Sequence, residues 1–266
     1  MKDIIETRLQ EEASLFITQN KLDVNEIEVF PKEIETYYFK KGEFEDESVH
    51  KNELQKNNKN HFYVHRWGTN KGDKYKGGYY PGLDFVVSED DDTYYSYLIR
   101  SAVIKYKGAF INKGQTIIGP NKVLNTICEI GKVTFENLEK DTVKLENSCI
   151  PNDGVVISER INLNKGFIDK KLRFVLCDDL YISSKYPKKE EMIINFLTSE
   201  NKQNMPANPI DFCKNKLGYV PSSIKKYLFK RNLIKLYLPI RTPTPFISLI
   251  GCQRCVRICI KISIRF

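Results

Sequence analysis

The sequence predicts an α+β fold with one main domain and a basic C-terminal extension. Segments rich in β-forming residues, several of them alternating apolar with polar side chains, fill the middle of the chain. Helical patterns lie before and between these segments, which favours an α+β over a regularly alternating α/β fold. The chain has 266 residues, of which 41% are hydrophobic and 29% charged, so it can bury one core, or one core with an appendage.

The first half of the chain is predicted to begin with a helix and to continue with strands. Residues 1–22 have the spacing of an amphipathic helix, formed by Ile4, Ile5, Leu9, Leu15 and Phe16. A linker is expected from there to residue 30. Strands are predicted at 33–39, 61–67, 83–88 and 94–104. The segments 40–60 and 68–82 are polar and are predicted to be loops, the first with a short helix as the alternative.

The second half is predicted to mix short helices with the closing strands. Gly119-Pro120 places proline in the first turn of a helix that runs to about residue 130. A second short helix is expected within 135–145. Residues 155–163 and 172–176 are predicted to be strands, and residues 188–197 are predicted to form a helix.

The net charge of +8 comes from the C-terminal part of the chain. Residues 212–266 contain 12 Lys or Arg and no Asp or Glu, which leaves 30 basic against 34 acidic residues in 1–211. Such a block either contacts phosphate or an anionic surface, or is a solvated tail. Residues 253–266 alternate apolar with basic side chains, which fits a strand with one basic face, a poorly ordered tail or a translated frameshift. We therefore divide the chain into a main domain, 1–185, and an extension, 186–266.

The sequence lacks the features of a membrane-spanning or exported protein. Its longest late stretch without charge, 242–253, contains two prolines and is shorter than the roughly 20 apolar residues of a spanning helix. The first residues are acidic and lack an apolar run, unlike a signal peptide. We expect a cytoplasmic protein, nucleoid-associated if bacterial, with reduced cysteines. Cys252, Cys255 and Cys259 lack a fourth ligand, since no histidine follows His65, so no metal is expected.

Period-2 geometry groups candidate chemical residues on strand faces. Residues i and i+2 of a strand share a face about 7 Å apart, which places Glu35 beside Tyr37, and Tyr63 beside His65. A carboxylate next to flat rings suits a pocket where the rings stack on a heterocyclic base and the carboxylate takes a proton from water. The alternative is a half-buried strand with a solvated acid. All histidines lie within 16 residues, in such a site or as ordinary surface residues: His50, His61 and His65.

A series of short motifs extends from this first strand to about residue 183. Glu-x-Tyr at 35–37 is followed by Asp46 and His50, and then by Phe-Tyr-Val-His at 62–65. The later motifs are Leu-Ile-Arg-Ser at 98–101, Gly-Pro-Asn-Lys at 119–122, Arg-Ile-Asn-Leu at 160–163 and Lys-Lys-Leu-Arg-Phe at 170–174. In order and spacing, these motifs resemble those of the alkyladenine (3-methyladenine) DNA glycosylase family.

The resemblance implies a fold and an activity. The fold would be methylpurine-DNA-glycosylase-like, a single domain with a curved, mostly antiparallel sheet flanked by helices. The activity would be that of a base excision repair enzyme, which flips an alkylated or deaminated purine out of double-stranded DNA and hydrolyses its N-glycosidic bond. Such an enzyme is a hydrolase without lyase activity, and we expect a monomer that uses no cofactor or metal.

The resemblance also assigns roles to residues at the matching positions. Glu35 would be the general base that activates water, with Arg100 and the backbone carbonyl of Ile161 helping to hold that water. The residues expected to line the base pocket are Tyr37, His50, Tyr63, His65 and Asp84. The residues expected to contact DNA are Trp67, Lys71, Lys74, Lys76, Lys122 and Arg160.

The chain also departs from the family pattern. His65 stands where the family has a tyrosine, and Trp67 lies one residue early for the side chain that fills the gap left by a flipped base. Asp84 is the polar residue nearest to the place of an asparagine that gates the family pocket. The segment 68–82 looks like an insertion. Two alternatives stay open: a non-catalytic nucleic-acid-binding relative, and a membrane-surface or partner-binding module driven by the basic extension.

Overall fold

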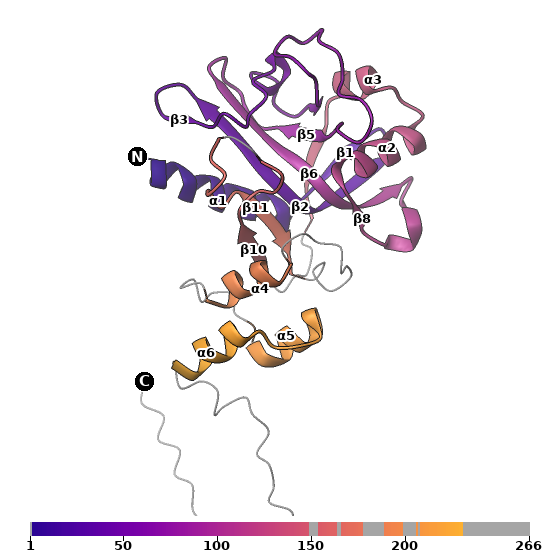
Figure 1. The fold of residues 1–266 in the computed structure, drawn as a ribbon. Helices are drawn as coiled ribbons and strands as arrows, with labels where there is room; N and C mark the ends of the chain where they lie inside the picture. Colours follow the sequence, from indigo (N-terminus) through magenta and orange to yellow (C-terminus); the bar gives the residue numbers. More distant parts are fainter. Residues whose placement is uncertain are drawn as a thin grey trace, which may run out of the picture.

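The predicted α+β class is confirmed by the computed structural model, which describes residues 2–148, 154–163, 166–177, 189–198, 206 and 208–230. These residues form a curled antiparallel sheet with the shape of a half-barrel and six α-helices (Figure 1). The strands are β1 (Asn20–Val24), β2 (Ile27–Lys40), β3 (Phe44–Glu45), β4 (Phe62–Val64), β5 (Leu83–Val86), β6 (Thr93–Tyr106), β7 (Ala109–Phe110), β8 (Ile117–Ile118), β9 (Lys144–Asn147), β10 (Val155–Ser158) and β11 (Arg173–Leu176). The helices are α1 (Lys2–Gln19), α2 (Pro120–Gly131), α3 (Phe135–Lys140), α4 (Lys189–Thr198), α5 (Pro209–Leu217) and α6 (Ser222–Lys230), with 3-10 turns η1 (Glu53–Gln55) and η2 (Ile111–Gly114).

Two long strands form the centre of the sheet. β2 and β6 have 14 residues each and pair along their length, and the main path of the sheet runs β10-β11-β2-β6-β5-β4. The register between β2 and β6 shifts between Pro31 and Ile34. A bulge of this kind bends its strand and increases the local twist, which contributes to the curl of the sheet.

The two faces of the sheet differ in chemistry because side chains alternate along each strand. On β6, Tyr97 and Ile99 belong to the apolar core, whereas Leu98 and Arg100 line a cleft on the opposite face. On β5, Phe85 belongs to the core, and Asp84 lines the same cleft. The core face therefore stabilises the domain, and the other face carries the polar residues.

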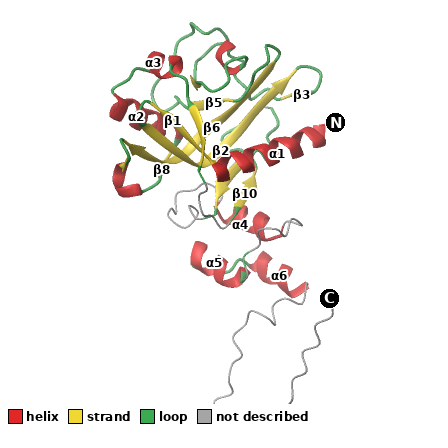
Figure 2. Cartoon of the chain, turned by 180° about the vertical axis from the view of Figure 1, so that it is seen from behind, coloured by secondary structure: helices red, strands yellow, loops and turns green. Residues whose placement is uncertain are grey.

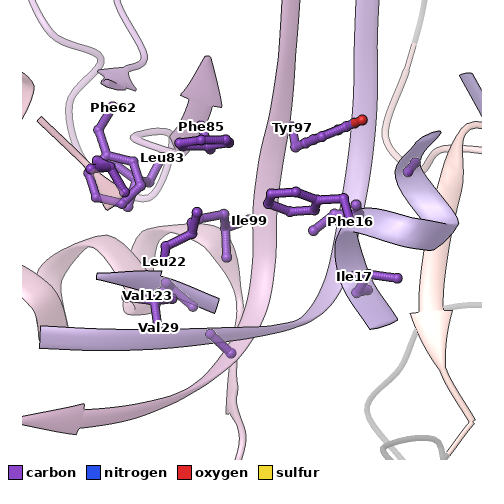
Figure 3. Packing of buried hydrophobic residues seen from close by; sticks show 14 of the residues in the cluster. Phe16, Ile17, Leu22, Val29, Phe62, Leu83, Phe85, Tyr97, Ile99 and Val123 are labelled. Atoms are coloured by element: carbon purple, nitrogen blue, oxygen red, sulfur yellow. The ribbon is translucent and has the colours of Figure 1, made fainter. Parts of the chain in front are cut away.

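Aromatic packing joins α1 to the core face. The Phe16 ring lies 4.5 Å from the Tyr97 ring and 5.6 Å from the Phe85 ring, centroid to centroid (Figure 3). The apolar stripe of α1 consists of Leu9, Ala13, Phe16 and Ile17, all buried. Ile4 and Leu15, which we expected on this stripe, are 74% and 54% exposed. The placement of these two residues was wrong, because the helix face that contacts the sheet carries the residues next to them, Ile5 and Phe16.

Helix α2 packs on the same core and begins where the sequence predicts. Gly119 precedes the helix with a φ of 112°, a conformation that glycine adopts without a Cβ clash, and Pro120 occupies the first turn. Its side chains Val123, Leu124 and Ile127 are buried. The helix ends at Lys132, which adopts the left-handed conformation typical of a helix C-terminus.

In the described part of the chain after residue 186, α4 packs against β10, and α5 and α6 pack on α4. Val156 of β10 and Val175 of β11 form a second apolar cluster with α4, α5 and α6 (Figures 1 and 2). Val175 lies two residues from Arg173 and therefore on the same face of β11, so α4 lies beside the strip of this face that carries charged residues. Part of the predicted extension is therefore packed against the main domain. The boundary at residue 185 stays a prediction.

Several predicted elements differ from those in the structure. The expected linker between residues 23 and 30 contains the end of β1 and the start of β2. The predicted helix within 135–145 is α3 followed by β9, since Asp141 ends the helix in an extended conformation. The strand expected over 155–163 ends at Ser158. Asn162 has a φ of 60°, a left-handed backbone conformation that is incompatible with a strand. Residues 253–266 lie outside the described part of the chain. Among the described helices, none is long and apolar enough to cross a membrane.

Candidate active site

The candidate site is a row of residues that runs across five neighbouring strands. The strand register places Arg173 of β11 opposite Glu35 of β2, and Glu35 opposite Leu98 of β6. Leu98 is in turn opposite Asp84 of β5, which is opposite Tyr63 of β4. Neighbouring strands lie about 4.8 Å apart, so residues far apart in sequence become direct neighbours on this face.

The Glu35 carboxylate is held by three donors. Its Oε2 accepts a hydrogen bond from the Tyr37 hydroxyl at 3.0 Å and lies 3.3 Å from a terminal nitrogen of Arg100. Its Oε1 accepts a hydrogen bond from the backbone N–H of Ile161 at 3.0 Å. The structure thus brings Glu35, Tyr37, Arg100 and Ile161 together, with the amide of Ile161 in contact with the carboxylate. These donors stabilise the negative charge, because a buried carboxylate needs partners.

A second carboxylate orients Arg100. Oε1 of Glu33 accepts from Nε of Arg100 at 3.0 Å and from Nε of Arg173 at 2.7 Å. Burial on its own lowers the pKa of Arg100, but the negative charges of Glu35 and Glu33 outweigh it and raise that pKa above its ordinary value. Glu33 was not among the predicted site residues, although it lies two residues before Glu35.

Arg160 lies in the interior of the domain, whereas we expected it to contact DNA. Its guanidinium is fully buried, 2.6 Å from Asp46 Oδ2, and donates to the backbone carbonyl of Thr36 at 3.1 Å. The same guanidinium lies 4.8 Å from the centre of the Tyr37 ring. Because the side chain is shielded from solvent, it cannot contact a DNA phosphate, and the expectation of a DNA contact is corrected. Arg160 instead holds Tyr37 in place.

Three buried carboxylates, two buried guanidinium groups and the partly exposed guanidinium of Arg100 form ion pairs on both sides of Tyr37. Their formal charges cancel, which is the condition under which such a cluster can be kept out of water. The members are Glu33, Glu35, Asp46, Arg100, Arg160 and Arg173.

A cleft of about 520 Å³ lies directly above this cluster. Tyr37, Arg100 and Ile161 form part of its lining, while His50, His65 and Asp84 line it further along the sheet. Glu35 is 0% exposed and is not among the described residues that line the cleft. The carboxylate is therefore reached from the cleft through its own hydrogen-bond partners.

His65 and Asp84 form a polar pair on the cleft wall. Nε2 of His65 donates to Asp84 Oδ1 at 2.8 Å, while Asp84 Oδ2 accepts from Ser96 at 2.7 Å and from Gln55 at 3.2 Å. Burial favours a raised pKa for Asp84, but the charge of His65 and the hydrogen bonds from His65 and Ser96 outweigh it, so the pKa of Asp84 lies below its ordinary value. Gly82 packs on the other edge of His65: a Cβ at this glycine would lie 2.7 Å from the ring.

His50 is part of a second hydrogen-bonded group. Its Nε2 lies 2.7 Å from Lys76 Nζ, and its Nδ1 lies 3.1 Å from the Tyr63 hydroxyl. A lysine ammonium can only donate, so Nε2 accepts and Nδ1 carries the ring proton, an assignment that follows from the network. Tyr63 is 0% exposed and supports His50 from below. Its expected contact with a substrate is therefore corrected to a supporting role.

Part of the rim of the cleft is formed by Trp67 and by the segment 68–82 that follows it, which we predicted as an insertion. Trp67 is 66% exposed and lies 6.2 Å from Tyr80, centroid to centroid, with Lys76 Nζ 5.7 Å from the Trp67 ring. Lys71 and Lys74 are exposed on the same loop but do not line the cleft. The remaining predicted DNA contact, Lys122, is exposed on the first turn of α2, close to Pro120, which does line the cleft.

A buried ion pair fastens this rim loop to the domain. Both terminal nitrogens of Arg66 donate to the Glu139 carboxylate of α3, and the Tyr75 hydroxyl donates to Glu139 Oε2 at 2.8 Å. Arg66 also stacks on the Tyr75 ring, 4.0 Å from its centre. The loop that carries Trp67 and Lys76 therefore has a fixed base.

Sequence reasoning missed the residues that act behind the cleft. Glu33 shares the Glu-x-Glu spacing with Glu35, and period 2 alone could have grouped the two. Arg173, in contrast, joins them only through the β11–β2 register, which no pattern within one strand reveals. The same is true of Gln55, Ser96 and Glu139, whose partners are 12 or more residues away in sequence.

No protein-family model and no curated protein matches this sequence. A proposal about the function of this chain therefore has to start from the chemistry of the site. It combines a buried carboxylate, a guanidinium and a tyrosine hydroxyl beneath a cleft with aromatic walls and an exposed aromatic rim.

Proposed function

We propose that this protein is a DNA N-glycosylase of the methylpurine-DNA-glycosylase-like fold, which removes alkylated or deaminated purines from DNA in base excision repair. The order of the motifs from Glu35 to residue 174 motivates the proposal. The observation that carries it is the convergence of Arg100, Tyr37 and the amide of Ile161 on one fully buried carboxylate, Glu35. These residues come from two strands and a turn that are up to 126 positions apart in sequence.

The charge of Glu35 suits the chemistry of glycosidic bond cleavage. Breaking the bond between C1′ and the base nitrogen gives the sugar oxocarbenium character in the transition state. A fixed negative charge beneath the cleft stabilises that positive charge and needs no reorganisation during the reaction. Water completes the hydrolysis by attacking C1′, and the carboxylate is the final acceptor of its proton.

The dimensions and walls of the cleft suit one extruded base. Its volume of about 520 Å³ lies within the range of small-molecule sites, roughly 300–1,000 Å³. Tyr37, His50 and His65 supply flat rings on which a purine can stack. At the rim, Trp67 is in position to occupy the space that an extruded nucleotide leaves in the duplex.

A second candidate is a nucleic-acid-binding relative that performs no chemistry. The observation that favours it is the complete burial of Glu35 behind its partners, which leaves no carboxylate oxygen exposed in the cleft. This candidate predicts that the protein binds damaged DNA and leaves the base attached.

The test uses duplex oligonucleotides that contain one hypoxanthine or one 3-methyladenine, with the freed base measured by chromatography. We expect the wild-type protein to release the base and Glu35→Gln to lower the rate by at least about 100-fold, the lower end of general acid–base contributions. Glu129→Gln, on an exposed position of α2, is the matched control and should retain the wild-type rate. Binding without release by the wild-type protein would support the second candidate.

A further inference from the structure

The burial of Glu35 restricts how its carboxylate can take part in a reaction in the cleft. Three groups lie between the carboxylate and the cleft: the Tyr37 hydroxyl, the Arg100 guanidinium and the backbone N–H of Ile161. All three residues line the cleft, whereas Glu35 does not. A proton that passes from the cleft to Glu35 must therefore cross one of these groups, or one of them must first move.

Only one of the three groups can pass on a proton. A guanidinium stays protonated in proteins, and a backbone N–H is a donor that does not exchange its role during a reaction. A tyrosine hydroxyl both donates and accepts, so it can receive one proton while it gives up another. Tyr37 already donates to Glu35 Oε2 at 3.0 Å, which is the geometry that such a transfer requires.

We propose that the Tyr37 hydroxyl is a catalytic proton relay between the attacking water and Glu35, a role that rests on the proposed glycosylase function. The water oxygen forms a bond to C1′ as the bond between C1′ and the base nitrogen breaks, and the base departs with that electron pair. One water proton moves to Tyr37 Oη, and the original hydroxyl proton of Tyr37 moves to Glu35 Oε2. The departing base takes a proton from solvent, and Glu35 returns its proton to solvent afterwards.

The surroundings of Tyr37 hold its ring in place. They therefore favour a proton relay over a side chain that moves aside to open a path to Glu35. The Arg160 guanidinium lies 4.8 Å from the ring centre and is itself paired with the buried Asp46, so the ring is held on one side. Burial and the neighbouring charge of Glu35 raise the pKa of Tyr37 well above its ordinary value. The hydroxyl therefore carries its proton at neutral pH and can donate it.

Stacking is the competing role for Tyr37, and two substitutions separate it from the relay. Tyr37→Phe removes the hydroxyl and keeps the ring, whereas Tyr37→Leu removes both. If Tyr37 only stacks on the base, the phenylalanine variant should act like the wild-type protein and the leucine variant should be impaired. If Tyr37 relays a proton, both variants should lose chemistry, and only the leucine variant should also lose affinity.

The experiment measures single-turnover release of hypoxanthine from a duplex, and in parallel the affinity for that duplex. We expect Tyr37→Phe to lower the release rate about 100-fold with unchanged affinity. Tyr106→Phe, at the far end of β6, is the matched control and should retain the wild-type rate. A Tyr37→Phe rate within about twofold of wild type would overturn the relay and leave the proposed function intact.

A measurement on the wild-type protein keeps the test independent of how the variants fold. Release rates in mixtures of light and heavy water should follow a curved dependence on the deuterium fraction, because two protons move together in a relay. A linear dependence would show a single moving proton and would contradict the relay. If the wild-type protein binds the duplex and frees no base, the proposed function fails and the relay with it, so the two failures are distinguishable.

Discussion

At the scale of single residues, the site depends on charged groups that are buried with their partners. Period 2 in the sequence groups Glu35 with Tyr37 and Tyr63 with His65, and the structure places both pairs on one face of the sheet. The sequence could not assign the hydrogen bond between His65 and Asp84, because the pairing of β4 with β5 brings them together. Nor could it separate buried from exposed basic residues: Arg160 and Lys71 look alike in a sequence.

The His65–Asp84 pair gives a prediction for stability against pH. The pKa of Asp84 is lowered in the folded protein, so the unfolded chain binds this proton more tightly than the folded chain. The ionised Asp84 therefore stabilises the fold above its ordinary pKa of 3.8, and this contribution is lost as the pH falls through the lower pKa of the folded state. At pH 7, Asp84→Asn should lower the free energy of unfolding by about 2 kcal/mol, since hydrogen bonds to a charged group are weakened.

Urea unfolding of the wild-type protein and Asp84→Asn between pH 7 and pH 3 measures this contribution. The difference between the two proteins should shrink as the pH falls below about 4, where Asp84 of the unfolded chain begins to take up its proton. Asp91→Asn, which changes an exposed carboxylate, serves as the control and should leave the stability unchanged at every pH. A difference for Asp84→Asn that is constant over the whole range would contradict the argument.

At the scale of secondary structure, the sequence predicts which segments are strands more reliably than how they pair. Alternation and β-forming residues predict the strand at 94–104, and β6 extends only slightly beyond it. The path β10-β11-β2-β6-β5-β4 depends on long-range pairing, which the pattern within a strand does not encode. The bulge between Pro31 and Ile34 is likewise a property of two strands together.

Helix α4 provides the prediction at this scale. Ile193 of α4 is 0% exposed in the cluster that joins α4, α5 and α6 to β10 and β11. Ile193→Ala should lower the free energy of unfolding by about 2–4 kcal/mol, because it removes buried methyl groups and leaves a cavity. The measurement is urea unfolding at pH 7, with Ile4→Ala on the 74% exposed position of α1 as the control.

If Ile193→Ala instead costs no more than Ile4→Ala, the three helices do not contribute to the stability of the sheet. In that case residues 186–266 would behave as an independent extension, as the change in composition predicts. If the loss is as large as expected, the main domain includes α4 to α6, and a chain cut at residue 185 should expose Val156 and Val175 and aggregate.

At the scale of the whole molecule, charge is distributed unevenly between the cleft and its surroundings. The charges beneath the cleft cancel, whereas the rim loop carries exposed lysines and aromatic rings. A neutral floor with a basic rim would bind DNA through phosphates at the edge and leave the base for the aromatic cleft.

The rim lysines therefore give a prediction for salt dependence. Each phosphate contact contributes about 0.9 to the slope of log affinity against log salt concentration. Lys71→Ala together with Lys74→Ala should reduce that slope by about 1.8 and should lower affinity equally for damaged and undamaged duplex. Titration of a fluorescent duplex at several salt concentrations measures the slope.

The matched control is Lys140→Ala with Lys144→Ala, two exposed lysines on α3 and β9 that do not line the cleft. This control should leave the slope unchanged. Equal slopes for the rim double variant and the wild-type protein would show that DNA does not contact the rim loop, and the basic C-terminal residues would then be the remaining candidates.

The central claim is that the Glu35 cluster cleaves a glycosidic bond and does more than bind DNA. The most direct measurement uses excess protein over a duplex with one hypoxanthine, and records the bound duplex and the freed base in the same sample. We predict that wild-type protein frees the base from all the duplex it binds, whereas Glu35→Gln binds the duplex and leaves the base attached. Complete binding by wild-type protein with every base still attached would contradict the claim.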